Sequence, residues 1–183
     1  MTVDALSPVA VSQRSGVAYQ PGIGPHTESS TVRLVMERLS FAHPERYANF
    51  ALGVPYGAGL RQACDLCLGP PSAWDLAVEV KMLRMLGDNG KPNDNILMHI
   101  LSPYPAHRSA LTDCVKLAAT ELAPRKGIII YGYDYKSWPM DPAIEAFEAL
   151  GEAASGLGPR SVASFAGLVH SELPRPGVGG IAV

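Results

Sequence analysis

The sequence predicts an α/β protein in which a mixed β-sheet is flanked by helices. Apolar and polar residues alternate over residues 74–83, which is typical of a strand, and residues 126–133 form a near-continuous apolar run, which is typical of a strand covered on both faces. Helical periodicity appears before, between and after these strands, at residues 27–42, 109–122 and 141–154. Helices and strands that alternate in this way are characteristic of the α/β class.

The N-terminal part is expected to contain an irregular arm followed by a helix. Residues 1–25 hold several prolines and glycines and no sustained period, so a single domain is expected over residues 26–183. The helix should begin near Thr27, a good capping residue, and end at about Ala42. A short helix from Glu45 to Leu52 should follow it. The buried stripe of the first helix is expected to hold Val32, Val35, Met36 and Leu39.

Two antiparallel strands are expected next, at residues 60–68 and 74–83, because the turn formers of residues 69–72 separate them. One face of the second strand should enter the core, and its apolar content indicates that the other face is covered as well. The first face holds Leu76, Val78, Val80 and Met82, and the second holds Asp75, Ala77, Glu79 and Lys81.

The remaining elements are expected in a regular order. A polar loop at residues 87–95 leads to a short helix, Ile96 to Leu101, and Ser109 should cap the helix that ends at Leu122. The apolar run of residues 126–133 is expected to be a central strand. The last elements should be a helix from Asp141 to Ala154 with Ile144, Phe147 and Leu150 facing inward, a strand from Ser161 to His170, and an edge strand from Gly180 to Val183.

Composition narrows the class of protein. The chain has 183 residues, 47% of them hydrophobic, and a formal net charge of −2, which argues against a general polybasic binder of nucleic acid but allows an enzyme that contacts a few phosphates. Its three cysteines suit a reducing compartment. No secretory leader or membrane-spanning run is visible, so the protein is expected in the cytoplasm, without a membrane partner. Cys64 and Cys67 should point to opposite faces of a strand, which disfavours a zinc site.

Asp65, Glu79 and Lys81 form the candidate site. Neighbouring strands lie about 5 Å apart, so the two carboxylates could share one divalent cation. Lys81 shares a strand face with Glu79 and could orient a water molecule or stabilise a pentavalent phosphate. Asp75 is a weaker candidate, because two pleats place it about 13 Å from Glu79. A solvated hairpin face with a cross-strand salt bridge is the structural alternative.

Asp65 followed by Glu79-x-Lys81, on a hairpin after an N-terminal helix, resembles the PD-(D/E)XK nuclease superfamily over about residues 28–135. The resemblance implies a restriction-endonuclease-like core (αβββαβ) and Mg²⁺- or Mn²⁺-dependent cleavage of DNA or, less often, RNA. It also implies that Asp65, Glu79 and the Val80 carbonyl bind the metal and that Lys81 is the catalytic lysine. Glu37 could supply the acidic residue that some members carry on the first helix. Ala63-Cys64 stands where the family motif has a proline.

Accessory roles and alternatives follow from the remaining charged residues. Lys91 could contact a phosphate from the polar loop, and Arg108 could do so beside a helix N-terminus, although a solvated turn and a surface arginine explain them equally well. Asp113 and Lys116 are three residues apart on a predicted helix, so an exposed ion pair explains them. A homodimer is a reasonable expectation for cleavage of both DNA strands, since two sites must face the two strands. The alternative function is an inactive nuclease-like domain that binds nucleic acid or a protein partner.

Overall fold

A four-stranded mixed sheet forms the centre of the structure, a computed structural model that describes residues 13–14, 17–18, 27–57, 62–86, 92–93, 95–133 and 137–164. The strand order is β3-β4-β5-β6, with antiparallel pairing at β3–β4 and β4–β5 and parallel pairing at β5–β6. The predicted mixed α/β class is confirmed. The strands are β3 (Phe50–Pro55), β4 (Ala63–Leu68), β5 (Leu76–Leu83) and β6 (Arg125–Gly132). Separately, β1 (Gln13–Arg14) pairs with β2 (Val17–Ala18).

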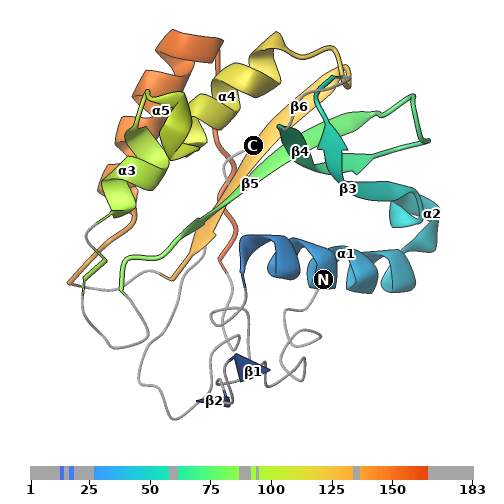
Figure 1. Ribbon diagram of the computed structural model, residues 1–183, viewed down its shortest axis with the longest axis horizontal. Coiled ribbons are helices and arrows are strands. Elements are labelled where there is room, and N and C mark those ends of the chain that lie inside the picture. The colour runs from blue at the N-terminus through green and yellow to red at the C-terminus, as the bar shows by residue number, and fades with distance from the viewer. Residues whose placement is uncertain are drawn as a thin grey trace.

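Helices cover both faces of the sheet (Figure 1). One face contacts α1, and the other contacts α4 and α5, with α3 beside them. The helices are α1 (Glu28–Ala42), α2 (Pro44–Tyr47), α3 (Ile96–Leu101), α4 (Ala110–Ala119) and α5 (Asp141–Ser155), and a 3₁₀ turn, η2, spans Pro105–His107. None of the helices within the described part of the chain is long and apolar enough to cross a membrane.

The helix α1 forms as its sequence predicts. The Thr27 hydroxyl accepts a hydrogen bond from the Ser30 amide at 3.3 Å, which satisfies one of the free amides of the first turn. Val32 and Met36 are buried against the sheet, and Val35 and Leu39 pack at the edge of the same cluster. The apolar stripe therefore fixes which side of α1 faces the sheet.

Both faces of β5 are covered, also as predicted. Val78 and Val80 pack in the cluster beneath α1, whereas Ala77 is buried in the cluster on the opposite face. Glu79 points to that second face and is only 2% exposed. A buried carboxylate destabilises the fold unless polar partners or counter-charges surround it, so the surroundings of Glu79 decide what this face can do.

Several expected elements differ in the structure. The expected helix from Glu45 to Leu52 is wrong: α2 ends at Tyr47, and the next residues join β3, where Leu52 pairs with Leu66. Sheet pairing with β4 outweighs the weak helical pattern there. The helix α5 is confirmed, but Leu150 is 44% exposed instead of facing inward.

The strand β6 is confirmed, but it is the last strand in the described sheet order and not a central one. Ile128 and Ile130 are nevertheless buried because helices cover the face to which they point. An apolar run therefore reports burial of the strand faces and not the number of neighbouring strands. Residues 161–164 form no regular structure, and the rest of the expected strand to His170 lies outside the described residues, as do Gly180–Val183 and most of the expected arm.

Gly132 marks a close approach between β5 and β6. A Cβ atom added there would lie 2.1 Å from the Leu83 carbonyl oxygen, which is too close without movement of the backbone. We expect Gly132→Ala to lower the free energy of unfolding by about 2 kcal/mol or more, measured by urea denaturation. Gly158→Ala, where the added Cβ has open space, is the matched control and should change stability by less than about 0.5 kcal/mol. Equal effects of the two substitutions would contradict this prediction.

Candidate functional site

A cavity of about 880 Å³ lies where α4, the start of α1 and the diverging strands β4 and β5 meet. Charged side chains from four different elements line it, although the protein as a whole carries little net charge. The acidic members are Glu28 of α1, Asp65 of β4, Glu79 of β5 and Asp113 of α4, and the lysines are Lys81 of β5 and Lys116 of α4.

The cavity begins where the β4–β5 ladder ends. Leu66 and Val78 are the last paired residues, so the next position in the same register brings Asp65 opposite Glu79. Beyond it, the Val80 amide donates to Asp65 Oδ2 at 2.8 Å. The Asp65 carboxylate thus accepts the hydrogen bond that a β4 backbone carbonyl would otherwise accept. The structure also brings together Asp65 and Glu79, the two carboxylates of the site predicted from the sequence.

The same edge of β5 uses a second carboxylate further along. The Met82 amide donates to Glu28 Oε2 at 2.6 Å. Within one strand residue the amide and the carbonyl point to the same edge, so the Val80 carbonyl also faces the Asp65 side. Asp65 and Glu28 therefore stabilise a strand edge that β4 no longer pairs, in addition to any chemical role.

Glu79 accepts its hydrogen bonds from two other elements. Its Oε1 atom accepts from the Tyr56 hydroxyl at 2.5 Å and from Lys116 Nζ at 3.2 Å. Burial is the main cause that raises the pKa of Glu79 to about 9, followed by the hydrogen bond and charge of Asp65 and by the charge of Asp113. The protein around Glu79 therefore favours either a proton or an additional cation at this carboxyl group.

Lys81 is held in its charged form at the centre of the cluster. Its Nζ atom lies 2.9 Å from Asp113 Oδ2 and 3.7 Å from Glu28 Oε1, and it donates to the Arg108 carbonyl at 3.2 Å. Burial alone would lower the pKa of Lys81, but the charges of Asp113 and Glu28 outweigh it and raise the pKa above the ordinary value. The ammonium is therefore a fixed positive charge facing the cavity.

Asp113 and Lys116 belong to this cluster, and their interpretation as an exposed ion pair is wrong. Asp113 is 2% exposed, and its Oδ1 atom lies 2.6 Å from Lys116 Nζ. The signal was present in the sequence, because Asp113 lies three residues after Ala110 and four before Leu117, both buried. Helical spacing therefore places Asp113 on the buried side of α4.

The acidic residue of α1 that lines the cavity is Glu28 and not Glu37. Glu37 is exposed and does not line the cavity. It follows Glu28 by nine residues, which is two and a half helical turns, so it lies about 13 Å along the axis and on the other side of the helix. The contact of Glu28 with the Met82 amide depends on how α1 packs against the sheet, so no local pattern in the sequence indicates it.

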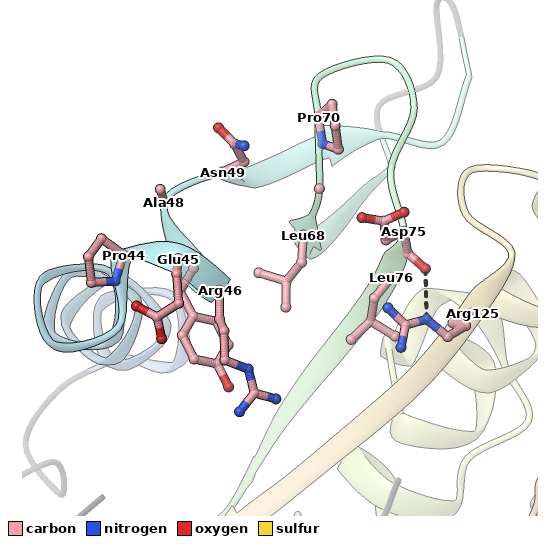
Figure 2. A pocket seen from close by; sticks show the side chains of 12 residues that line it. Pro44, Glu45, Arg46, Ala48, Asn49, Leu68, Pro70, Asp75, Leu76 and Arg125 are labelled. Carbon is pink, nitrogen blue, oxygen red and sulfur yellow. Dashed lines mark hydrogen bonds between the residues drawn. The ribbon is translucent and has the colours of Figure 1, made fainter.

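The other predicted residues divide between the cavity and elsewhere. Arg108 lines the cavity with an exposed side chain, whereas Lys91 lies outside the described residues. Asp75 is away from the cluster, beside a separate cavity of about 410 Å³ between α2 and the end of the β4–β5 hairpin (Figure 2). There its backbone carbonyl accepts a hydrogen bond from Arg125 Nε at 3.3 Å. Asp65, and not Asp75, therefore accompanies Glu79.

Cys64 and Cys67 lie in the same buried cluster, so the expectation that they face opposite sides is wrong. Beyond Leu66 the strand β4 no longer pairs with β5, although Cys64 still pairs with Val54 of β3, and Cys64 Sγ donates to the Val78 carbonyl at 3.3 Å. A hydrogen bond from Cys67 is the main cause that lowers the pKa of Cys64 to about 7.

The donor chemistry of the cavity fits a hard divalent cation. Four carboxyl groups line the cavity with two lysines and with Arg108, which is exposed and therefore screened by water, so the buried part of the cluster lacks positive charge. Carboxylate and carbonyl oxygens are the ligands that Mg²⁺ prefers. Among the described residues, no group of three or more His, Cys, Asp or Glu side chains is already arranged around a common point that could hold an ion. A cation would therefore depend on Asp65, Glu79 and the Val80 carbonyl, with water completing the coordination.

Neither protein-family models nor curated proteins nor solved structures give a match to this chain. The function proposed below is therefore supported by the residues of the cavity and by the order of the elements that carry them.

Proposed function

We propose that the protein is a metal-dependent nuclease that hydrolyses phosphodiester bonds of DNA. The observation that carries this proposal is the convergence of Asp65, Glu79 and Lys81 in one cavity, at the point where the β4–β5 ladder opens. Two facing carboxylates and a neighbouring charged lysine are the groups that hydrolysis of a phosphodiester needs.

The proposed roles follow from the surroundings of each side chain. Asp65, Glu79 and the Val80 carbonyl would hold Mg²⁺ or Mn²⁺, which when bound would neutralise phosphate charge and lower the pKa of a water molecule. Asp113 and Glu28 keep Lys81 protonated, so its ammonium would stabilise negative charge on the phosphate or orient the water, and it would not act as a general base.

The fold supports the same proposal at a finer level. The order α1, β3, β4, β5, α4, β6 agrees with the restriction-endonuclease-like core (αβββαβ) that the Glu79-x-Lys81 motif suggests. Arg108, exposed at the cavity, would contact a phosphate next to the cleaved one, and Lys91 would act as a second contact. A homodimer would present two such cavities to the two DNA strands.

Cleavage of supercoiled plasmid by the purified chain tests the proposal. Nicked or linear product should form with Mg²⁺ or Mn²⁺ and should be absent with EDTA. Glu79→Ala and Lys81→Ala should each lower the rate by at least about a hundredfold, because each removes a charge needed in the transition state. Lys126→Ala is the matched control, since Lys126 lies on β6, does not line the cavity, and donates to the Ala118 carbonyl. Cleavage that survives both site substitutions would overturn this assignment.

A second candidate function, an inactive nuclease-like domain that binds nucleic acid or a protein partner, is favoured by a specific observation. Glu79 Oε1 already accepts hydrogen bonds from Tyr56 and Lys116, so protein groups occupy one oxygen of a proposed metal ligand. DNA binding that is independent of metal, together with no cleavage under any metal condition, would favour this function over the first.

A further inference from the structure

Lys116 holds a place that the proposed function leaves without a role. It comes from α4, yet its Nζ atom contacts Glu79 Oε1 at 3.2 Å and Asp113 Oδ1 at 2.6 Å. The ammonium also lies 5.5 Å from the centre of the Tyr56 ring, which favours a cation there. Glu79 and Asp113 are almost fully buried, so Lys116 is not one of several exchangeable surface cations around them.

We propose that Lys116 is an internal counter-ion of Glu79 that opposes entry of the divalent cation and so sets the affinity of the site for metal. The inference rests on the proposed function for the identity of the metal ligands. It assigns a positioning and regulatory role to Lys116, whose ammonium competes for the charge of one ligand.

Two effects of Lys116 on metal binding have opposite signs. As a hydrogen-bond donor Lys116 orients Glu79, so loss of this hydrogen bond would weaken metal binding. This effect should be small, because Tyr56 donates to the same oxygen and the buried Glu79 side chain has little freedom. As a positive charge it repels the cation across a few ångströms of protein, where such interactions are much stronger than in water. The charge effect should therefore exceed the orienting effect.

The same conclusion holds when Glu79 carries a proton in the metal-free protein. Removal of one positive charge strengthens binding of the proton as well as binding of the metal. The metal ion has twice the charge of the proton that it displaces, so the change in potential favours the metal by the larger amount. Loss of the Lys116 charge should therefore tighten metal binding at constant pH.

Titration of the full chain with Mn²⁺, followed by calorimetry in the absence of nucleic acid, tests the inference. Lys116→Met, which keeps the length of the side chain and removes the charge, should bind Mn²⁺ at least about tenfold more tightly than the wild type. Lys116→Arg, which keeps the charge, should remain within about threefold. Lys126→Met is the matched control for the loss of one lysine and should not change the affinity, because Lys126 does not line the cavity and its amine donates to the Ala118 backbone carbonyl.

The outcomes separate this inference from the nuclease proposal. Tighter binding by Lys116→Met supports the inference even when neither protein cleaves DNA, in which case only the nuclease activity fails. Unchanged or weaker binding by a folded Lys116→Met variant, judged by its circular dichroism spectrum, overturns it. Absence of Mn²⁺ binding by the wild type and every variant overturns it as well, because no metal site then exists. Glu79→Gln should weaken binding in the same assay, which verifies that the titrated site is this one.

Discussion

Replacement of Glu79 by glutamine should raise the free energy of unfolding at pH 8 and flatten its dependence on pH between about 5 and 9. The pKa of Glu79 is about 9 in the folded protein, against 4.5 for an unperturbed glutamate. Between these values the folded state holds a proton that the unfolded state has released. This contribution to stability is therefore fully present below pH 4.5 and is lost progressively as the pH rises to 9.

The size of the effect follows from the size of the shift. Each pKa unit corresponds to about 1.4 kcal/mol, and about three and a half units separate pH 8 from the unperturbed value, so the glutamine variant should exceed the wild type by on the order of 5 kcal/mol at pH 8. Glutamine keeps the shape of the side chain and an oxygen that can accept from Tyr56 and Lys116. Urea denaturation across the pH range measures the effect.

Glu148→Gln is the control for this experiment, because Glu148 forms a partly exposed ion pair with Arg160. It should leave the pH dependence of the wild type in place. A wild-type protein whose stability rises steadily from pH 5 to pH 9 would contradict the prediction, since the Glu79 carboxyl group would then have a depressed pKa. Mn²⁺ should stabilise the wild type at pH 8 and have little effect on the glutamine variant, because a ligand stabilises only the state that binds it.

The sequence predicted those elements that local chemistry determines. The caps at Thr27 and Ser109 and the alternation along residues 76–82 depend on neighbouring residues alone, and the corresponding helices and strand are present. The segment near Leu52 was mistaken for a helix because its strand conformation depends on pairing with β4. The strand β4 comes later in the chain, so local sequence around Leu52 does not show this pairing. Position within the sheet could not be predicted for residues 126–133, since burial by helices and burial between strands produce the same apolar run.

The candidate site shows the same limit. Asp65 and Glu79 could be paired from sequence because a hairpin brings adjacent strands into register. Glu28 and Lys116 could not, since their contacts with β5 depend on how α1 and α4 pack against the sheet. For Lys116, the local explanation by an ion pair with Asp113 concealed the long-range contact with Glu79. The sequence therefore did not predict the charged residues that α1 and α4 contribute to the cluster, and these residues determine its net charge.

That balance predicts that the loss of a lysine from the cluster costs more stability than the loss of a carboxylate. With Glu79 protonated and the exposed Arg108 screened by water, three carboxylates still face two lysines, and Lys81 is held between Asp113 and Glu28. Lys81→Met keeps most of the side-chain volume but leaves the buried Asp113 carboxylate and the partly exposed Glu28 carboxylate with less counter-charge. We expect it to lower the free energy of unfolding by about 3–5 kcal/mol, the range for a broken buried ion pair, measured by urea denaturation without metal.

Asp113→Asn separates this explanation from a simple count of broken ion pairs. Asp113 forms two short ion pairs, at 2.9 Å and 2.6 Å, so a count of pairs would make its loss the more damaging. The charge balance gives the opposite order, because the substitution removes negative charge from a cluster that has too much of it. Arg160→Met, which breaks a partly exposed pair, is the control and should cost less than about 1 kcal/mol. If Asp113→Asn is more destabilising than Lys81→Met, the cluster does not lack positive charge, and the electrostatic reason to expect a divalent cation in this cavity is removed.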